Sequence, residues 1–172
     1  MLNHQQIKKL ILKKGLIQNY INLEKQLTPN GFDLTVEEIL EFDSLGSLDF
    51  SNKERRIPQG SPLLPKKQSP EDKFGWWHLK KGVYKIRTNE IIKLDASLVA
   101  LCFPRTSLLR MGAFSQHGIW DAGFEGKGEF ILVVENPFGI MLKQNARIVQ
   151  LIFFKIKKAK SLYNGLYKQK KG

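Results

Sequence analysis

The sequence predicts an all-β domain, built as a barrel or a sandwich. Short strand-like runs fill the chain from Val83 onward, turn signals separate them, and no crossover helix lies between them. Helical crossovers join the strands of parallel sheets, so their absence favours a fold made of strands and tight turns. The expected strands span residues 83–87, 90–93, 97–103, 130–135, 140–142 and 147–154.

The composition is that of one ordinary globular domain. The chain has 172 residues, of which 42% are hydrophobic, and a formal net charge of +12. We expect residues 1–172 to form a single domain, since this length buries one proper core. The lone cysteine, Cys102, excludes an intramolecular disulfide framework and a cysteine-based zinc site. No apolar run approaches the roughly 18 residues of a membrane span, so we expect a cytoplasmic protein without a membrane partner.

A short helix is expected over residues 1–15. Asn3 can cap it, Gln6 stands where a capping-box partner would, and Gly15 can end it. Apolar side chains at i, i+3 and i+4 give this segment one buried face.

The next segments are a strand and a long loop. Residues 32–36 alternate like a strand after turn residues at 28–31. Residues 51–75 are rich in proline and polar side chains, and we expect one long loop there, of the kind that is functional or mobile.

The positive charge gathers near the C-terminus. From Asn136 to Gly172 there is no acidic residue, while lysines and arginines recur throughout. Such a segment favours an anionic partner, either nucleic acid or a small polyphosphate, or else forms a solvated surface. Phe153 and Phe154 lie within an apolar run, so the exposed aromatics that nucleic-acid binding would use are missing there.

Several common chemistries are excluded. The three histidines are scattered without metal-ligand spacing. The chain contains no phosphate-binding loop of the GxxxxGK[ST] type, no GxGxxG motif and no GxSxG nucleophile motif. Any nucleotide chemistry must therefore use another scaffold.

The segment after the strand at residues 97–103 is a candidate anion site. Pro104 suits the first turn of a short helix, and Thr106 and Ser107 place hydroxyls and amides at its start. Arg105 and Arg110 can add charge-assisted contacts to phosphate. A capped helix with surface arginines is the alternative interpretation.

A second candidate is the glycine-rich stretch at residues 118–126. Asp121 lies there between two aromatic residues, Trp120 and Phe124. A carboxylate beside aromatic rings suits a general base that holds a water in a sheltered pocket. Asp121 could instead be a turn residue that bonds its own backbone.

The order of these segments resembles the dUTPase and dCTP deaminase superfamily, in its archaeal dUTPase branch. The resemblance rests on Gly-Phe-Asp-Leu, Pro-Arg-Thr-Ser-Leu, Asp-Ala-Gly-Phe-Glu-Gly, Arg-Ile-Val-Gln-Leu and the tail Tyr-Asn-Gly-Leu-Tyr, at residues 31–34, 104–108, 121–126, 147–151 and 163–167. It implies a distorted β jelly roll of the dUTPase-like β-clip kind, with a short helix after the Pro-Arg-Thr-Ser motif. It also implies a homotrimer with active sites between subunits and a closing tail at residues 160–172.

The resemblance further implies a role for each matching residue. The triphosphate of dUTP would be held by Arg105, Thr106, Ser107, Arg110 and Gln150.

Mg²⁺ would be the cofactor, and Asp33 would support the Mg²⁺-bound phosphates through a water molecule. Asp121 would activate the attacking water. Phe124 would pack against the sugar, and Tyr167 with Gln169 would close over the site.

Two reactions share this scaffold, and one position separates them. By resemblance, a deaminase carries a Glu about ten residues beyond Asp121, where this chain has Ile131. Glu129 and Glu135 flank that position out of register. We therefore expect a dUTP diphosphatase that forms dUMP and pyrophosphate. The alternatives are a dCTP deaminase, alone or bifunctional, and a non-catalytic nucleotide- or nucleic-acid-binding protein.

Overall fold

The computed structural model describes residues 1–168. Three helices occur in this part of the chain, α1 (His4–Lys14), α2 (Leu23–Gln26) and α3 (Thr106–Arg110). None of them is long and apolar enough to cross a membrane. The strands are β1 (Ile17–Gln18), β2 (Leu27–Thr28), β3 (Gly31–Glu41), β4 (Ser61–Pro62), β5 (Trp76–Leu79), β6 (Gly82–Lys93), β7 (Leu98–Pro104), β8 (Ala113–Gln116), β9 (Glu125–Val134), β10 (Ile140–Lys143) and β11 (Arg147–Lys155).

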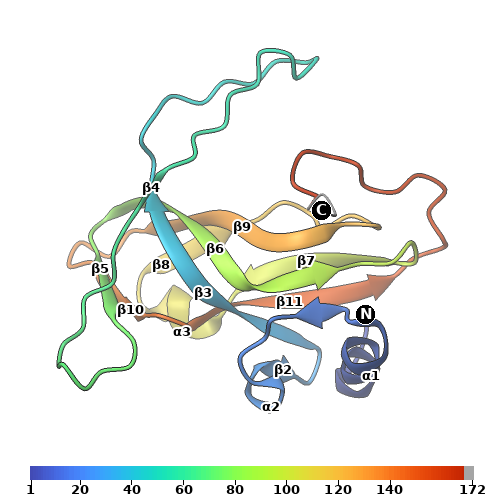
Figure 1. The fold of residues 1–172 in the computed structure, drawn as a ribbon, viewed down its shortest axis with the longest axis horizontal. Helices are drawn as coiled ribbons and strands as arrows, with labels where there is room; N and C mark the ends of the chain where they lie inside the picture. Colours follow the sequence, from blue (N-terminus) through green and yellow to red (C-terminus); the bar gives the residue numbers. More distant parts are fainter. Residues whose placement is uncertain (169–172) are drawn as a thin grey trace.

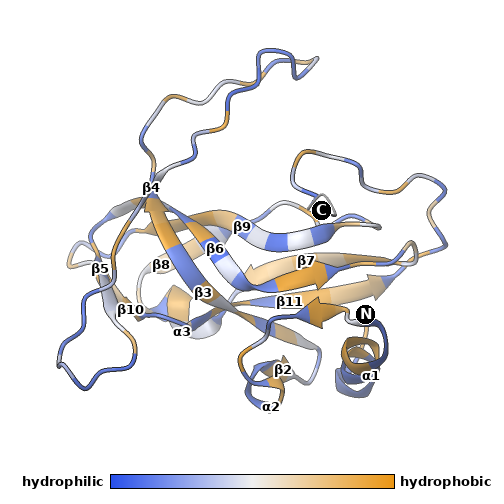
Figure 2. Ribbon diagram, viewed as in Figure 1, coloured by the Kyte–Doolittle hydropathy of each residue, from blue (hydrophilic) through white to orange (hydrophobic). Residues whose placement is uncertain are grey.

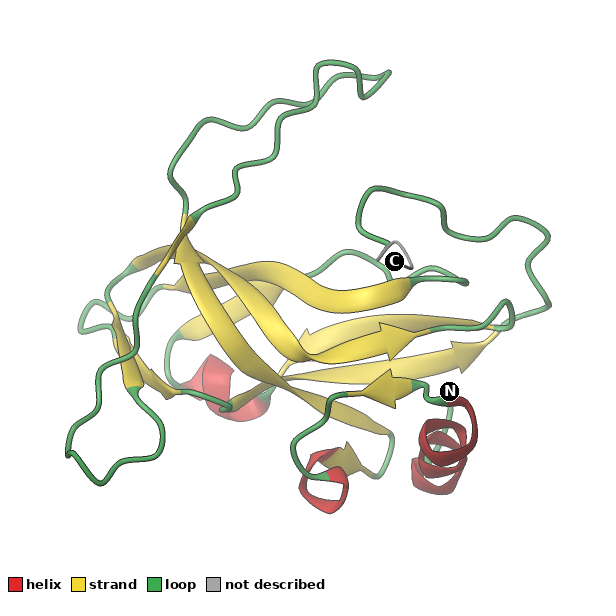
Figure 3. Cartoon of the chain, in the orientation of Figure 1, coloured by secondary structure: helices red, strands yellow, loops and turns green. Residues whose placement is uncertain are grey.

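One curved antiparallel sheet forms most of the molecule (Figures 1 and 3). Its strands follow the order β7-β11-β3-β6-β9-β8, with β1 on β6 and β2 and β4 on β3. The two ends of this path come together, because Ala100 in β7 forms a backbone bridge with Trp120, just beyond β8. The sheet is therefore a nearly closed barrel, and the prediction of an all-β fold with short helices is confirmed.

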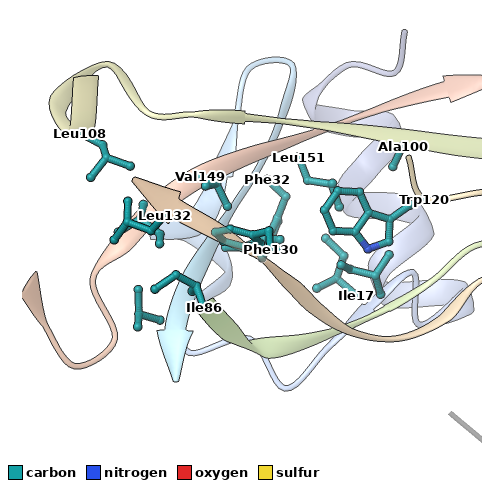
Figure 4. Packing of buried hydrophobic residues seen from close by; sticks show 14 of the residues in the cluster. Ile17, Phe32, Ile86, Ala100, Leu108, Trp120, Phe130, Leu132, Val149 and Leu151 are labelled. Carbon is teal, nitrogen blue, oxygen red and sulfur yellow. The ribbon is translucent and has the colours of Figure 1, made fainter. Parts of the chain in front are cut away.

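The hydrophobic core fills the inside of this curved sheet. Side chains from several strands meet there, including Phe32, Ile86, Phe130, Leu132 and Leu151 (Figure 4). Hydrophobic and hydrophilic residues mix along the same strands in Figure 2, as expected where one face is buried.

The N-terminal helix forms as its sequence predicts. The Asn3 side chain accepts from the Gln6 amide, the Gln6 side chain accepts from the Asn3 amide, and Gly15 ends α1 with φ 64°. Leu2, just before the cap, donates its backbone N–H to the Phe153 carbonyl at 2.8 Å. This bond ties the start of α1 to β11.

The expected loop of residues 51–75 is part of a longer irregular region, which begins after β3 and is divided in two by β4. Residues 42–60 form a projecting arm, drawn in cyan above the body in Figure 1. Strand β4 then pairs with the end of β3, and a second loop of residues 63–75 leads to β5. The division arises because Gly60, at φ 83°, turns the chain back so that Pro62 pairs with Leu40.

Candidate functional site

A polar hollow lies where β3, β7 and β11 meet the start of α3. Its volume is about 250 Å³. The register of β11 explains which residues line the hollow, since Gln150 stands opposite Asp33 of β3 on one side and Phe103 of β7 on the other. The lining residues are Thr28, Asp33, Pro104, Arg105, Thr106, Ser107 and Gln150.

Asp33 is the electrostatic centre of this hollow. Its side chain is only 3% exposed, and its Oδ2 lies 3.0 Å from Arg105 Nε and 3.4 Å from an Arg147 terminal nitrogen. Burial raises the pKa of Asp33, while the two guanidiniums act to lower it. The paired arginines keep a positive rim around a buried acid, which suits a polyanionic ligand that carries a metal ion.

The glycine of the Gly-Phe-Asp-Leu motif allows two strands to approach closely beside this hollow. A Cβ on Gly31 would lie 2.5 Å from the Leu151 carbonyl oxygen, too close for any other residue. The same approach lets Gln150 donate to the Thr28 hydroxyl. Thr28 and Arg147 are site residues that the sequence analysis did not assign, although Arg147 opens one of the matching motifs.

Asp121 lies in a tight turn on the hairpin between β8 and β9. The Phe124 amide donates to the Asp121 carbonyl at 3.0 Å, and Gly123 adopts φ 84°. Asp121 is exposed, whereas Trp120 and Phe124 on either side are buried. The hairpin thus presents one carboxylate at the rim of an aromatic surface.

A second, mostly apolar hollow of about 300 Å³ adjoins this hairpin. Trp120 and Phe124 supply aromatic walls, and Lys85, Lys127 and Glu129 supply its charges. The remaining lining residues are Phe42, Ile57, Gly118, Ile119, Phe130, Ile131, Tyr163 and Tyr167.

The C-terminal segment covers part of the hairpin. The Tyr163 amide donates to the Ala122 carbonyl at 2.8 Å, and the rings of Tyr163 and Phe124 lie 5.5 Å apart between centroids. Tyr167 lines the apolar hollow, and Gln169 lies outside the described residues.

The structure groups the expected site residues into two sets. Asp33, Arg105, Thr106, Ser107 and Gln150 line the polar hollow.

Phe124 and Tyr167 line the apolar hollow beside Asp121, and none of residues 1–168 lines both hollows. Arg110 is exposed at the end of α3 and lines neither hollow. Ala100, where the hairpin meets β7, lies four residues before Pro104, which corresponds to roughly 13 Å along a strand.

Comparison with known proteins then gives the family. A family model described as dCTP deaminase-like matches residues 1–156. The chain belongs to the dCTP deaminase-like family.

Relatives in this family match nearly the whole chain. It is 40% identical over 168 residues to the probable deoxyuridine 5′-triphosphate nucleotidohydrolase of Archaeoglobus fulgidus, covering 97% of this chain and 95% of the relative. It is 34% identical over 145 residues to the deoxyuridine 5′-triphosphate nucleotidohydrolase of Methanocaldococcus jannaschii, covering 84% and 88%. The crystal structure of 2′-deoxycytidine 5′-triphosphate deaminase from Agrobacterium tumefaciens shares the fold, with a TM-score of 0.64 and 20% identity over 91% of this chain and 48% of that one.

The two acids that flank Ile131 in sequence, Glu129 and Glu135, both form ion pairs. Glu129 lines the apolar hollow, but its Oε1 lies 3.6 Å from Lys85 Nζ and its Oε2 lies 3.2 Å from an Arg87 terminal nitrogen. Glu135 pairs with Lys81 at 2.7 Å. Both carboxylates are thus held in ion pairs, and Ile131 lines the hollow with an apolar side chain.

Proposed function

We propose that this chain is a dUTP diphosphatase, which hydrolyses dUTP to dUMP and pyrophosphate. The observation that carries the proposal is the apolar side chain of Ile131 in the hollow beside Asp121, with both nearby glutamates held in ion pairs. Deamination needs a free carboxyl group at the base, whereas hydrolysis needs only a positioned water and stabilised phosphates. The names of the archaeal relatives agree with hydrolysis.

In the proposed reaction Asp121 orients a water for attack on the α-phosphorus. A bond forms between the water oxygen and phosphorus, the bond to the bridging oxygen of the β-phosphate breaks, and Asp121 takes the proton. An exposed carboxylate on a hairpin can do this once the substrate and a covering subunit exclude bulk water.

The polar hollow is the proposed place for the triphosphate. Arg105 can donate to phosphate oxygens, and Thr106 and Ser107 add hydroxyl groups at the same rim. Gln150 is held there by its bond to Thr28. Arg110 lies outside the hollow, and we propose that it binds a part of the triphosphate that extends beyond the hollow.

A magnesium ion fits this site when it is carried by the phosphates. Both ion pairs of Asp33 use Oδ2, which leaves Oδ1 to accept a hydrogen bond from a metal-bound water. Bound Mg²⁺ would neutralise charge that develops on the phosphates. Within residues 1–168, no group of three His, Cys, Asp or Glu side chains could hold a metal ion directly.

We further propose a homotrimer in which each active site combines two subunits. The separation of the two hollows supports this, because a neighbouring chain can bring its polar hollow to the hairpin that carries Asp121. Exposed apolar side chains on the arm also support an assembly. Leu45, Leu48 and Phe50 are 89%, 78% and 105% exposed. Tyr167, with Gln169, would close over the bound nucleotide.

One incubation series tests the proposed function. Purified protein with Mg²⁺ receives dUTP or dCTP, and both pyrophosphate and ammonia are measured in every tube. We expect pyrophosphate from dUTP and no ammonia from dCTP. Ammonia from dCTP would contradict the proposal and favour a deaminase, and no product from either nucleotide would favour a binding role.

A further inference from the structure

A buried carboxylate that the proposed mechanism does not use lies behind the polar hollow. Glu90, in β6, is fully buried. It falls where the pairing of β6 with β9 shifts register between Arg87 and Ile91, in a stretch of β6 where every second residue from Ile86 to Ile92 is buried. The sequence periodicity would place an apolar residue at this position, so an acid there needs a specific reason.

Every polar contact of Glu90 comes from a hydrogen-bond donor. Its Oε2 accepts from the Thr35 amide at 2.9 Å. Its Oε1 accepts from the Gln26 side-chain amide and from the Thr35 hydroxyl, both at 2.6 Å. Burial raises the pKa of Glu90, and these donors act to lower it.

The direction of each of these bonds is set by further partners. The Gln26 Oε1 accepts from the Ile21 and Asn22 amides, so its nitrogen must face Glu90. The Thr35 hydroxyl accepts from Asn89, so its hydrogen points to Glu90. The cluster therefore requires an acceptor at both oxygens of residue 90.

The same cluster holds the backbone of Asp33. The Gln26 nitrogen that donates to Glu90 also donates to the Asp33 carbonyl at 2.9 Å. Thr35 lies two residues further along β3, on the same face of the strand. Glu90 thus holds β3 directly at Thr35 and, through Gln26, at the carbonyl of Asp33, whose carboxylate pairs with Arg105 and Arg147.

We infer that Glu90 is a positioning residue for the phosphate-binding half of the site. It sets where Asp33 stands, and through Asp33 it sets where Arg105 presents its guanidinium. Its effect falls on phosphate binding through Asp33, which lines the polar hollow, and neither Glu90 nor Asp33 lines the apolar hollow beside Asp121. This inference rests on the proposed function only in taking the polar hollow as the phosphate site.

The test uses the full chain and two separate probes, inorganic tripolyphosphate and deoxyuridine, titrated by calorimetry. Glu90→Gln keeps the shape but places an N–H against a donor. Thr35→Val is a milder change, because it removes only the hydroxyl that donates to Glu90. Thr35→Ser keeps that hydroxyl and is the control for Thr35→Val. Glu71→Gln is the matched control, because Glu71 is exposed on the loop of residues 63–75 and lines neither hollow.

We expect Glu90→Gln and Thr35→Val to weaken tripolyphosphate binding about tenfold or more, through the loss of charge-assisted bonds to phosphate. Deoxyuridine affinity should stay within about twofold, as should both affinities in the two control variants.

Several outcomes would overturn the inference. They are unchanged tripolyphosphate affinity in a folded variant, an equal loss for both probes, and no binding of tripolyphosphate by the unaltered chain. If Glu90→Gln does not fold, Thr35→Val decides alone. Turnover of dUTP by the unaltered chain is measured in parallel, so failure of the proposed function is seen separately from failure of this inference.

Discussion

The backbones of Ala100 and Trp120 exchange two hydrogen bonds, one at 3.0 Å from the Ala100 amide and one at 3.1 Å from the Trp120 amide. This bridge joins the two ends of the sheet into a nearly closed barrel. Because Asp121 follows Trp120 directly, closing the barrel also fixes the backbone of the proposed general base.

Asp121→Asn should lower kcat for dUTP by roughly 10²–10⁴-fold, the usual contribution of a positioned general base. Binding of a non-hydrolysable dUTP analogue should stay nearly unchanged, since the amide keeps the size of the carboxylate. Pyrophosphate release and calorimetry measure the two quantities. Asp43→Asn, at another exposed acid, is the control. Near-normal turnover in Asp121→Asn would exclude Asp121 as the base.

Arg105→Ala should weaken binding of the triphosphate roughly tenfold to a hundredfold, because it removes charge-assisted hydrogen bonds to phosphate. Deoxyuridine binding should change little, since Arg105 does not line the apolar hollow. Arg110→Ala is the informative comparison. A similar loss would place Arg110 on the triphosphate as the resemblance implies, and no loss would remove it from the site.

His117 should make folding stability sensitive to acid. It packs 4.5 Å from the Phe130 ring, its Nε2 is buried without a partner in residues 1–168, and burial lowers its pKa to about 4. Between that value and the unfolded value of about 6.5, the unfolded chain takes up a proton that the folded chain does not. Stability therefore falls as the pH falls through this window, by at most about 1.4 kcal/mol per pH unit and less with partial exposure.

His117→Phe removes this group and keeps an aromatic ring. The free energy of unfolding, from urea titrations near pH 7 and near pH 5, should fall less on acidification in the variant than in the unaltered chain. Equal falls in both proteins would show that His117 titrates normally in the folded state.

Replacing Leu45, Leu48 and Phe50 by serine should weaken the proposed trimer without weakening the fold, because these side chains are almost fully exposed on the arm. Sedimentation velocity at several concentrations measures the assembly, and thermal unfolding at low concentration measures the fold. Leu64→Ser is the control, since Leu64 is 82% exposed on the other loop. An unchanged assembly would show that the arm lies outside the interface.

Local sequence determined much of this protein. A short apolar run that follows turn residues was enough to predict β11, because a buried strand is apolar over a few consecutive residues. The capping box of Asn3 and Gln6 predicted where α1 begins, since both partners lie within one helical turn. Asp121 and Arg105 were predicted as site residues from short motifs whose chemistry can be read within a few residues.

Only the tertiary structure decided which of these residues meet. Asp33 reaches Arg147 and Arg105 through the register of β3, β11 and β7, and residues 42–60 became a projecting arm because β4 pairs with β3. In the sequence, Glu90 looks like an ordinary polar residue. Its contacts with Thr35 exist only because β6 folds against β3. Register between distant strands is set by the sum of packing across the whole barrel, and no local pattern contains that sum.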